Sequence, residues 1–211
     1  MRIRDNMTIL FQGDSVTDCG RDRASFDLGV GYPSLVAAKL QDLFPNFSLR
    51  FINRGVSGDR VVDLERRLTA DCIELQPDMV SILIGINDTW RRFDNNDETG
   101  VADFANAYGR VLMRIRRELP TASIVLLDPF VLPVLPGQDA WRVDLDPKIQ
   151  AVRTLAREFS TLYVPLDGLF AAACCEQEPF FFADDGVHPT AAGHMLIADA
   201  WVRAVVQDKQ F

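Results

Sequence analysis

The sequence predicts an α/β protein built around a doubly wound parallel sheet. Five apolar runs of strand length recur along the chain, and they are nearly continuous, as in strands that are buried on both faces. Stretches with apolar residues at helical spacing separate these runs. Because strands and helices alternate, we expect helices on both faces of the sheet and a ligand site beyond the carboxyl ends of the strands.

The predicted elements follow one another along the whole chain. The strands are TILFQ (8–12), LRFIN (49–53), MVSILI (79–84), SIVLLD (123–128) and TLYVPL (161–166). Two apolar helical stripes consist of Val61, Leu64, Leu68, Cys72 and Leu75, and of Val101, Phe104, Ala105, Tyr108, Leu112, Ile115 and Leu119. A third helix is predicted from about Pro147 to Phe159. The last helix follows Thr190, with one apolar face made by Leu196, Ile197, Ala200, Trp201, Ala204 and Val205.

Two segments are longer than the packing of helices on a sheet requires. They are CGRDRASFDLGVGY (19–32), after the first strand, and TWRRFDNNDETG (89–100), after the third. Both are predicted as loops. Because both follow carboxyl strand ends, we expect both to border the same crevice.

Length and charge limit the class of protein. A chain of 211 residues fits one domain, residues 1–211, that buries roughly 70% of its unfolded surface. No apolar stretch approaches the roughly 20 residues that span a bilayer. With 30 acidic and 22 basic residues the net charge is −8, which repels phosphate backbones and anionic membrane surfaces. We therefore expect neither a nucleic-acid partner nor a membrane partner.

The N-terminus and the cysteines indicate a cytoplasmic protein. The apolar segment before Gln12, TILF, is too short for the core of a signal peptide. The four cysteines, Cys19, Cys72, Cys174 and Cys175, match no metal-binding spacing. We expect them to be reduced thiols and expect no disulfide scaffold.

The chain has only two histidines, so the search for a base that works at neutral pH is short. His188 lies in the turn-rich segment FADDGVHPT, three residues after Asp185 and before Thr190, which is well placed to cap the last helix. Across a turn, that spacing can bring a carboxylate to Nδ1 and leave Nε2 free to accept a proton. The same spacing also suits a contact that only closes the loop. His194 lies at the edge of an apolar helical stripe, where we expect a packing role.

The segment FQGDSVTDCGRD puts Ser15 directly after the first strand, at the predicted crevice. The letters G-D-S do not match the G-x-S-x-G nucleophile elbow, so an α/β-hydrolase serine is not predicted. Ser15 is a candidate nucleophile, and a helix-capping role explains the same letters. Asp14 is either a functional carboxylate or a helix N-cap, and we favour the cap.

Acyl transfer also needs hydrogen-bond donors that face the developing oxyanion. Gly55, in NRGVSGD after the second strand, would let a backbone N–H approach a ligand closely, or it is a turn glycine. Asn87, in GIND after the third strand, could present its side-chain amide, or it caps a turn. A polar group after each of the first three strands, together with Asp185 and His188 before the last helix, favours a catalytic site.

These segments, in order, resemble the conserved blocks of the SGNH (GDSL) hydrolases: GDS with Ser15, NRGVSGD with Gly55, GIND with Asn87, and DGVH with Asp185 and His188. The resemblance implies a flavodoxin-like three-layer α/β/α sandwich with a five-stranded parallel sheet. It also implies that Ser15 is the nucleophile, that His188 is the general base and later acid, and that Asp185 orients His188. The oxyanion hole would consist of the Ser15 and Gly55 N–H groups and the Asn87 side chain.

Two longer segments, GDSVTDCGRDR and IGINDTWRRFD, resemble more particularly the intracellular acetylxylan esterases of this family. That resemblance implies a homo-oligomer and an acetylated oligosaccharide as substrate. Trp90 and Arg92 would then stand beside the crevice with Asp14 as substrate-binding residues. A tryptophan in this place suits stacking on a sugar ring, but it also suits packing of the loop or a subunit contact.

We therefore expect a serine esterase that needs no cofactor or metal and favours short acyl groups, acetate first. No long apolar lid that would house a fatty chain is visible in the sequence. The alternatives are a thioesterase or lysophospholipase with the same chemistry, and a non-catalytic carbohydrate-binding module with the same fold. A flavodoxin-type nucleotide binder is disfavoured because the chain is acidic and lacks a Gly-rich phosphate loop.

Overall fold

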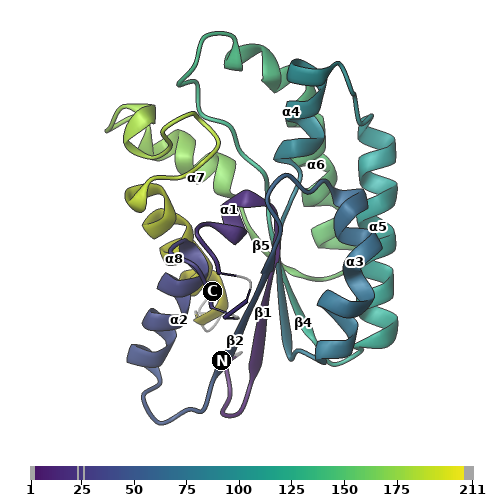
Figure 1. Ribbon diagram of the computed structural model, residues 1–211, viewed down its shortest axis with the longest axis vertical. Helices are drawn as coiled ribbons and strands as arrows, with labels where there is room; N and C mark the ends of the chain where they lie inside the picture. Colours follow the sequence, from purple (N-terminus) through teal and green to yellow (C-terminus); the bar gives the residue numbers. More distant parts are fainter. Residues whose placement is uncertain (1–2, 23, 26, 207–211) are drawn as a thin grey trace.

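The computed structural model describes residues 3–22, 24–25 and 27–206. Its centre is a five-stranded parallel sheet with the strand order β2-β1-β3-β4-β5 (Figure 1). The strands are β1 Thr8–Gly13, β2 Arg50–Gly55, β3 Met79–Leu83, β4 Ser123–Leu127 and β5 Leu162–Val164. All five predicted strands are therefore present, with ends shifted by at most two residues.

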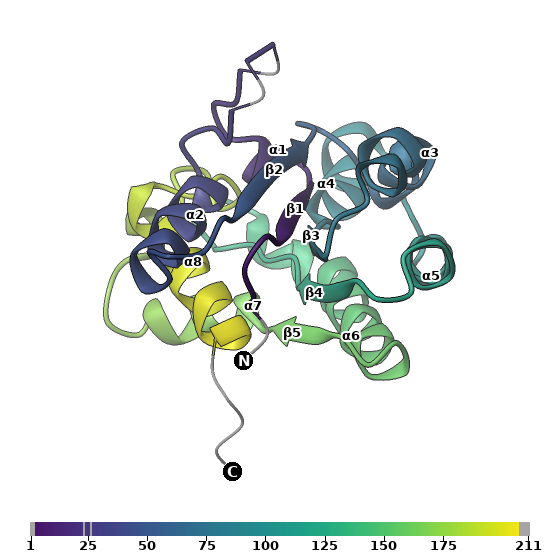
Figure 2. The same cartoon turned by 90° about the horizontal axis from the view of Figure 1, so that it is seen from below.

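Helices cover both faces of this sheet. They are α1 Ser15–Asp18, α2 Tyr32–Leu43, α3 Val61–Asp71, α4 Ile86–Asn95, α5 Val101–Glu118, α6 Arg142–Glu158, α7 Leu166–Ala173 and α8 Ala191–Val206, with short 3-10 helices at Ile73–Leu75, Gln138–Trp141 and Pro179–Phe181. Seen along the sheet, α2, α7 and α8 lie on one side and α3, α5 and α6 on the other (Figure 2). The predicted three-layer α/β/α sandwich is confirmed. None of the described helices combines the length and the apolar character needed to cross a lipid bilayer.

Alternate residues of each central strand serve the two layers, as the two-residue repeat of a strand requires. In β1, Ile9 and Phe11 belong to the apolar cluster under α2 and α8, whereas Leu10 belongs to the cluster under α3 and α5. The largest buried side chain, Trp201 of α8, lies against Phe11 with the two ring centroids 5.8 Å apart. Burial on both faces explains why these strands are apolar without alternation.

The register of the central strands sets the position of the site. Gly13, the last residue of β1, pairs with Gly55 of β2 and with Leu83 of β3. The three strands thus end at the same level. The segments that follow them meet at one edge of the sheet, as the doubly wound topology predicts.

Two predictions about local structure are wrong. Residues 89–100 are not a loop throughout, because α4 continues to Asn95. Ile86, Trp90 and Phe93 recur at helical spacing there, and the charged residues between them obscured this stripe. The helix predicted from Pro147 begins earlier, at Arg142. Pro147 removes only the bond to the carbonyl of Val143, and Val143 is 69% exposed, so water can replace that bond.

The cysteines agree with their prediction. Cys19, Cys72, Cys174 and Cys175 are all free thiols. Burial raises the pKa of the Cys72 thiol to about 12, so this cysteine behaves as a small apolar core residue.

Candidate active site

A serine, a histidine and an aspartate form a hydrogen-bonded series at the carboxyl edge of the sheet. Ser15 Oγ lies 3.0 Å from Nε2 of His188, and Nδ1 of the same ring lies 2.7 Å from Oδ2 of Asp185. The serine side chain is half-buried and the histidine is exposed, so the pair is open to a substrate. This arrangement can move a proton from the hydroxyl to the imidazole while the carboxylate holds the ring in one tautomer.

Ser15 reaches this position because β1 ends in a one-turn helix. Asp14 is the N-cap of α1, and its buried carboxylate accepts a hydrogen bond of 3.0 Å from the N–H of Val16. The capping role favoured for Asp14 from the sequence therefore agrees with the structure. Ser15 is the first residue of α1, where an N–H has no partner within the helix. Its N–H thus remains available to a ligand.

The loop before α8 holds Asp185 and His188 in place through three hydrogen bonds. Oδ1 of Asp185 accepts the N–H groups of Val187 at 2.9 Å and of His188 at 2.7 Å, and Oδ2 accepts the imidazole. Partial burial alone would raise the pKa of Asp185, but these bonds outweigh it and hold that pKa below its usual range. The carboxylate thus stays ionised and can orient the ring at neutral pH.

Apolar packing also holds this loop in place. Val187 is buried in a small apolar cluster with Ile86 of α4 and with Leu145 and Ile149 of α6. On the other side, the hydroxyl of Thr190 accepts the N–H of Gly193 at 3.3 Å and so caps α8, as the sequence predicts. The loop is therefore tied to both helical layers.

Asn87 lies near the start of α4 and is buried. Its Nδ2 donates a hydrogen bond of 3.1 Å to the carbonyl of Asp59, in the turn after β2. An amide nitrogen carries two hydrogens, so one remains for a ligand. The structure thus joins the segment after β3 to the segment after β2, as expected if both contribute to an oxyanion hole.

The oxyanion role predicted for Gly55 does not fit the structure. The N–H of Gly55 already donates to Oδ1 of Asn53 at 2.8 Å. A Cβ at this position would lie 2.5 Å from the backbone nitrogen of Asp18. The glycine is thus needed because α1 packs directly against the end of β2, and its backbone is not free to approach a ligand.

Gly58 is the glycine of the same segment that is free to donate. It is exposed, its φ is +86°, and apart from its two chain neighbours no described residue comes within 4 Å of the place where a Cβ would stand. Among the described residues its N–H has no hydrogen-bond partner. Gly58 could not be singled out from the sequence, because NRGVSGD contains two glycines and only the contact with α1 tells them apart.

Aromatic rings line the site beside the histidine. The centroid of the Trp90 ring lies 5.7 Å from that of His188 and 5.5 Å from that of Trp141. Phe93 stacks on Trp141 at 5.5 Å with nearly parallel planes and is 39% exposed. Trp90 therefore lies where the sequence predicts. Trp141 was missed because it lies 51 positions further along the chain, in a segment without a recognisable motif.

Arg92, predicted with Trp90, makes contacts within the protein. Its Nη1 lies 2.9 Å from Oδ1 of Asp144 in α6 and 3.1 Å from Glu98. Asp144 also pairs with the buried Lys148. The structure thus gives Arg92 the role of tying α4 to α6.

Three further side chains have pKa values shifted by burial. Burial raises the pKa values of Asp14 and Asp88 to about 7 each. The negative charge of Asp88 also raises the pKa of Asp14. His194 is 4% exposed, accepts the Tyr32 N–H at Nδ1, and has a pKa lowered by burial to about 4. The packing role predicted for His194 agrees with this burial.

A small void lies next to the site. A cavity of about 10 Å³, roughly the room that one water molecule needs, is lined by Asp14, Val16, Ile86 and Val187, among others. Val16 and Val187 are the neighbours of Ser15 and His188. Within the described part of the chain, no group of three His, Cys, Asp or Glu side chains could hold a metal ion.

The fold and the Ser-His-Asp series are those of a serine hydrolase. The sequence model of the GDSL-like lipase/acylhydrolase family matches residues 11–196, and the chain belongs to this family. It is 36% identical to an acetylxylan esterase of Geobacillus stearothermophilus, over 97% of this chain and 96% of the relative.

Solved structures give the same result. A GDSL-like lipase from Parabacteroides merdae superposes with a TM-score of 0.93 at 35% identity, over 97% of both chains. A catalytic mutant of the Geobacillus stearothermophilus acetylxylan esterase superposes with a TM-score of 0.90 at 34% identity, over 99% of this chain and 98% of the other. Variants of that esterase described as catalytic mutants replace a serine, an aspartate and a histidine by alanine.

Proposed function

We propose that this protein is a serine esterase that removes acetyl groups from xylo-oligosaccharides or related carbohydrates. The observation that carries the proposal is the continuous series from Ser15 Oγ through His188 to Asp185, with distances of 3.0 Å and 2.7 Å. The acetylxylan esterase relative supports the substrate class, and its catalytic mutants involve the same three residue types.

In the proposed mechanism Ser15 Oγ attacks the carbonyl carbon of the acetyl ester while Nε2 of His188 takes the hydroxyl proton. The tetrahedral intermediate collapses, and His188 gives that proton to the departing sugar oxygen. A water molecule, deprotonated by His188, then hydrolyses the acetyl-enzyme and releases acetate. Asp185 stays ionised throughout and stabilises the imidazolium.

The oxyanion would receive three hydrogen bonds in this proposal. The donors are the N–H of Ser15, the second N–H of the Asn87 amide and the N–H of Gly58, which replaces Gly55 in the set expected from the sequence. Each donor of this kind contributes on the order of 10²–10³-fold to the rate.

The aromatic surface of Trp90 and Trp141 supports a sugar as the leaving group. His188 would protonate the departing sugar oxygen, so the sugar would lie beside it. Flat aromatic rings at that place suit stacking on a sugar ring. Asp14 is buried under α1 and Arg92 is paired with α6, so neither is proposed to contact the substrate.

The expectations of one domain over residues 1–211, a cytoplasmic location and a homo-oligomer stay predictions. The same chemistry would serve a thioesterase or a lysophospholipase, which are the alternatives to test.

Acetate release decides between these functions. The protein is incubated with acetylated xylo-oligosaccharides, with an aryl acetate, and with aryl esters of increasing chain length, and the Ser15→Ala variant serves as the blank. We expect acetate from the oligosaccharide and a steep loss of activity beyond short acyl chains. Equal activity of the Ser15→Ala variant would refute the nucleophile, and a flat preference reaching long chains would refute the acetyl-sugar substrate.

A further inference from the structure

The turn after β2, Ser57-Gly58-Asp59, has Gly58 at its centre and is held by side chains on both of its other residues. Gly58 has a φ of +86° and is the third residue of a turn that the Asp59 N–H closes on the carbonyl of Val56 at 3.1 Å. That bond shapes the turn but does not set its distance from Ser15. If Gly58 donates to the oxyanion, as the proposed function requires, other residues must hold its N–H in place. The segment VTDCGRDR, which the mechanism leaves unused, supplies them.

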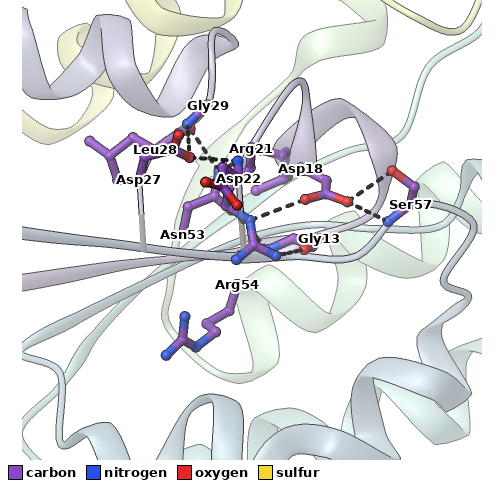
Figure 3. A network of polar contacts seen from close by, with 12 residues as sticks. Gly13, Asp18, Arg21, Asp22, Asp27, Leu28, Gly29, Asn53, Arg54 and Ser57 are labelled. Carbon is purple, nitrogen blue, oxygen red and sulfur yellow. Dashed lines mark hydrogen bonds and ion pairs between the residues drawn. The ribbon is translucent and has the colours of Figure 1, made fainter. Parts of the chain in front are cut away.

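On the side of Ser57 the contacts come from Asp18. Oδ2 of Asp18 accepts both the N–H of Ser57 at 3.0 Å and its hydroxyl at 2.9 Å. Oδ1 accepts Nε of Arg21 at 3.1 Å, and Nη2 of Arg21 donates to the carbonyl of Gly55 at 2.6 Å. Figure 3 shows Asp18 between Arg21 and Ser57, above the end of the sheet. The side chains of Arg21 and Asp18 are only 4% and 9% exposed.

On the side of Asp59 the contacts come from other elements. Nε of Arg67, in α3, lies 2.6 Å from Oδ2 of Asp59. The carbonyl of Asp59 accepts Nδ2 of Asn87, the second proposed oxyanion donor. The turn is therefore fixed at the residue before Gly58 and at the residue after it. The Gly58 N–H between them is left without a partner among the described residues.

We infer that Asp18 and Arg21 are positioning residues that hold the Ser57-Gly58-Asp59 turn at a fixed distance from Ser15. The inference rests on the proposed function of Ser15 and Gly58. Its geometric basis is that α1 has a single turn, with Ser15 as its first residue and Asp18 as its last. The same rigid turn therefore carries the nucleophile and the carboxylate that holds the oxyanion donor.

The chemistry of the pair supports a positioning role. A buried ion pair contributes little net stability, because the desolvation of two charges offsets most of their attraction. Two charge-assisted hydrogen bonds to one residue, in contrast, fix its backbone direction strongly. A displacement of about 1 Å in such a donor can lower the rate by about 10²-fold. The expected effect of the pair is therefore on kcat more than on binding.

The test compares Asp18→Asn, Ser57→Ala and a matched control, Asp128→Asn. Asp128 is also a buried carboxylate; it accepts the backbone N–H of Asp167 and the hydroxyl of Tyr163, and it forms an ion pair with Arg153 at 3.6 Å. It follows β4, two strands away from β1. Hydrolysis of an aryl acetate, thermal midpoints and inhibition by phenylboronic acid are measured for each variant at a temperature where all are folded. The tetrahedral boronate adduct of a serine places an oxygen in the oxyanion hole.

We expect Asp18→Asn to lower kcat about 10–100-fold and to change KM by no more than about twofold. Inhibition by phenylboronic acid should weaken by the same factor as kcat. Ser57→Ala keeps the bond from its N–H, so its kcat falls only a few-fold. The pH midpoint of kcat/KM stays unchanged in both, because Asp185 and His188 are untouched. Asp128→Asn keeps parental kcat and boronate inhibition, although its thermal midpoint falls.

A loss of kcat in Asp18→Asn no larger than in Asp128→Asn would overturn the inference. So would a loss confined to KM, or boronate inhibition that stays at the parental level. If the Ser15→Ala variant is as active as the parent, the proposed function is refuted instead. A parent that depends on Ser15, together with a fully active Asp18→Asn variant, refutes the positioning role alone.

Discussion

The hydroxyl oxygen of Ser15 lies 3.0 Å from Nε2 of His188, although 173 positions separate the two residues in the chain. They meet because the first strand and the loop before the last helix both open at the carboxyl edge of the sheet. No regular element joins them directly. The contact therefore depends on the one-turn helix α1 and on the hydrogen bonds of Asp185.

Asp185→Asn should retain the fold and lose most of the activity. Asparagine has nearly the same shape, but an amide nitrogen facing Nδ1 would favour the tautomer with the proton on Nε2, which cannot accept from Ser15. We expect kcat on an aryl acetate to fall about 10²–10⁴-fold with a thermal midpoint near that of the parent. A variant with parental kcat would show that the carboxylate does not orient His188.

Asn87→Ala should lower kcat about 10²–10³-fold, the effect of losing one oxyanion donor. KM should change little, because the donor acts on the charge that develops after binding. The measurement is steady-state hydrolysis of an aryl acetate. Thr89→Ala, two residues further along α4, is the control, because Thr89 faces Lys148 and not the turn after β2. Equal kcat values for the two variants would refute the oxyanion role.

Gly55→Ala and Gly58→Ala should separate the two glycines of NRGVSGD. A Cβ on Gly55 would lie 2.5 Å from the backbone nitrogen of Asp18, so the variant should unfold at a clearly lower denaturant concentration. A Cβ on Gly58 meets no described residue within 4 Å apart from its two chain neighbours, and its positive φ costs about 1–2 kcal/mol. We expect Gly58→Ala to stay folded and to lose kcat. Denaturant unfolding followed by kinetics distinguishes the two, and the reverse order would contradict the assignment.

Trp141→Ala should raise KM for acetylated xylo-oligosaccharides about 3–10-fold, since an aromatic contact of this kind contributes about 0.5–1.5 kcal/mol. Hydrolysis of a small aryl acetate should change less than twofold, because that substrate does not reach beyond Trp90. Trp141→Phe should restore most of the affinity. Parallel losses on both substrates would indicate that Trp141 only supports the packing of Trp90.

His194→Gln should make the protein less sensitive to acid. The pKa of His194 is about 4 in the folded protein and about 6.5 when unfolded, so the unfolded chain binds more protons between these values. This histidine therefore lowers stability as the pH falls from 6.5 to 4, by up to about 3 kcal/mol. Asp14 and Asp88, with pKa values raised to about 7, act in the opposite direction in the same range.

The measurement for His194→Gln is denaturant unfolding at several pH values between 7 and 4. Glutamine can still accept the Tyr32 N–H through its side-chain oxygen. We expect the difference in unfolding free energy between the variant and the parent to shift in favour of the variant as the pH falls. A constant difference over this range would show that His194 keeps an ordinary pKa in the folded protein.

Much of this molecule could be predicted from the sequence because the information is local or periodic. Continuous apolar runs predict strands buried on both faces, and the alternation with helices predicts a doubly wound sheet. The two histidines, the capped turn at Asp14 and Ser15, and the three-residue spacing of Asp185 and His188 all lie within short segments. The helix α4 was not predicted because the charged residues Arg91, Arg92 and Asp94 give its segment the composition of a loop. They hide the apolar stripe of Ile86, Trp90 and Phe93.

The fold class, the three residues of the hydrogen-bonded series and the family resemblance could all be predicted from the amino-acid order. Four other features emerge only in the folded chain: the difference between Gly55 and Gly58, the pairing of Arg92 with Asp144, the contact of Trp141 with Trp90, and the bonds from Asp18 to Ser57. Each of these depends on which segments lie against one another in space. Gly55 is excluded as a donor because α1 packs on β2, and the packing of those two elements leaves no pattern in either segment.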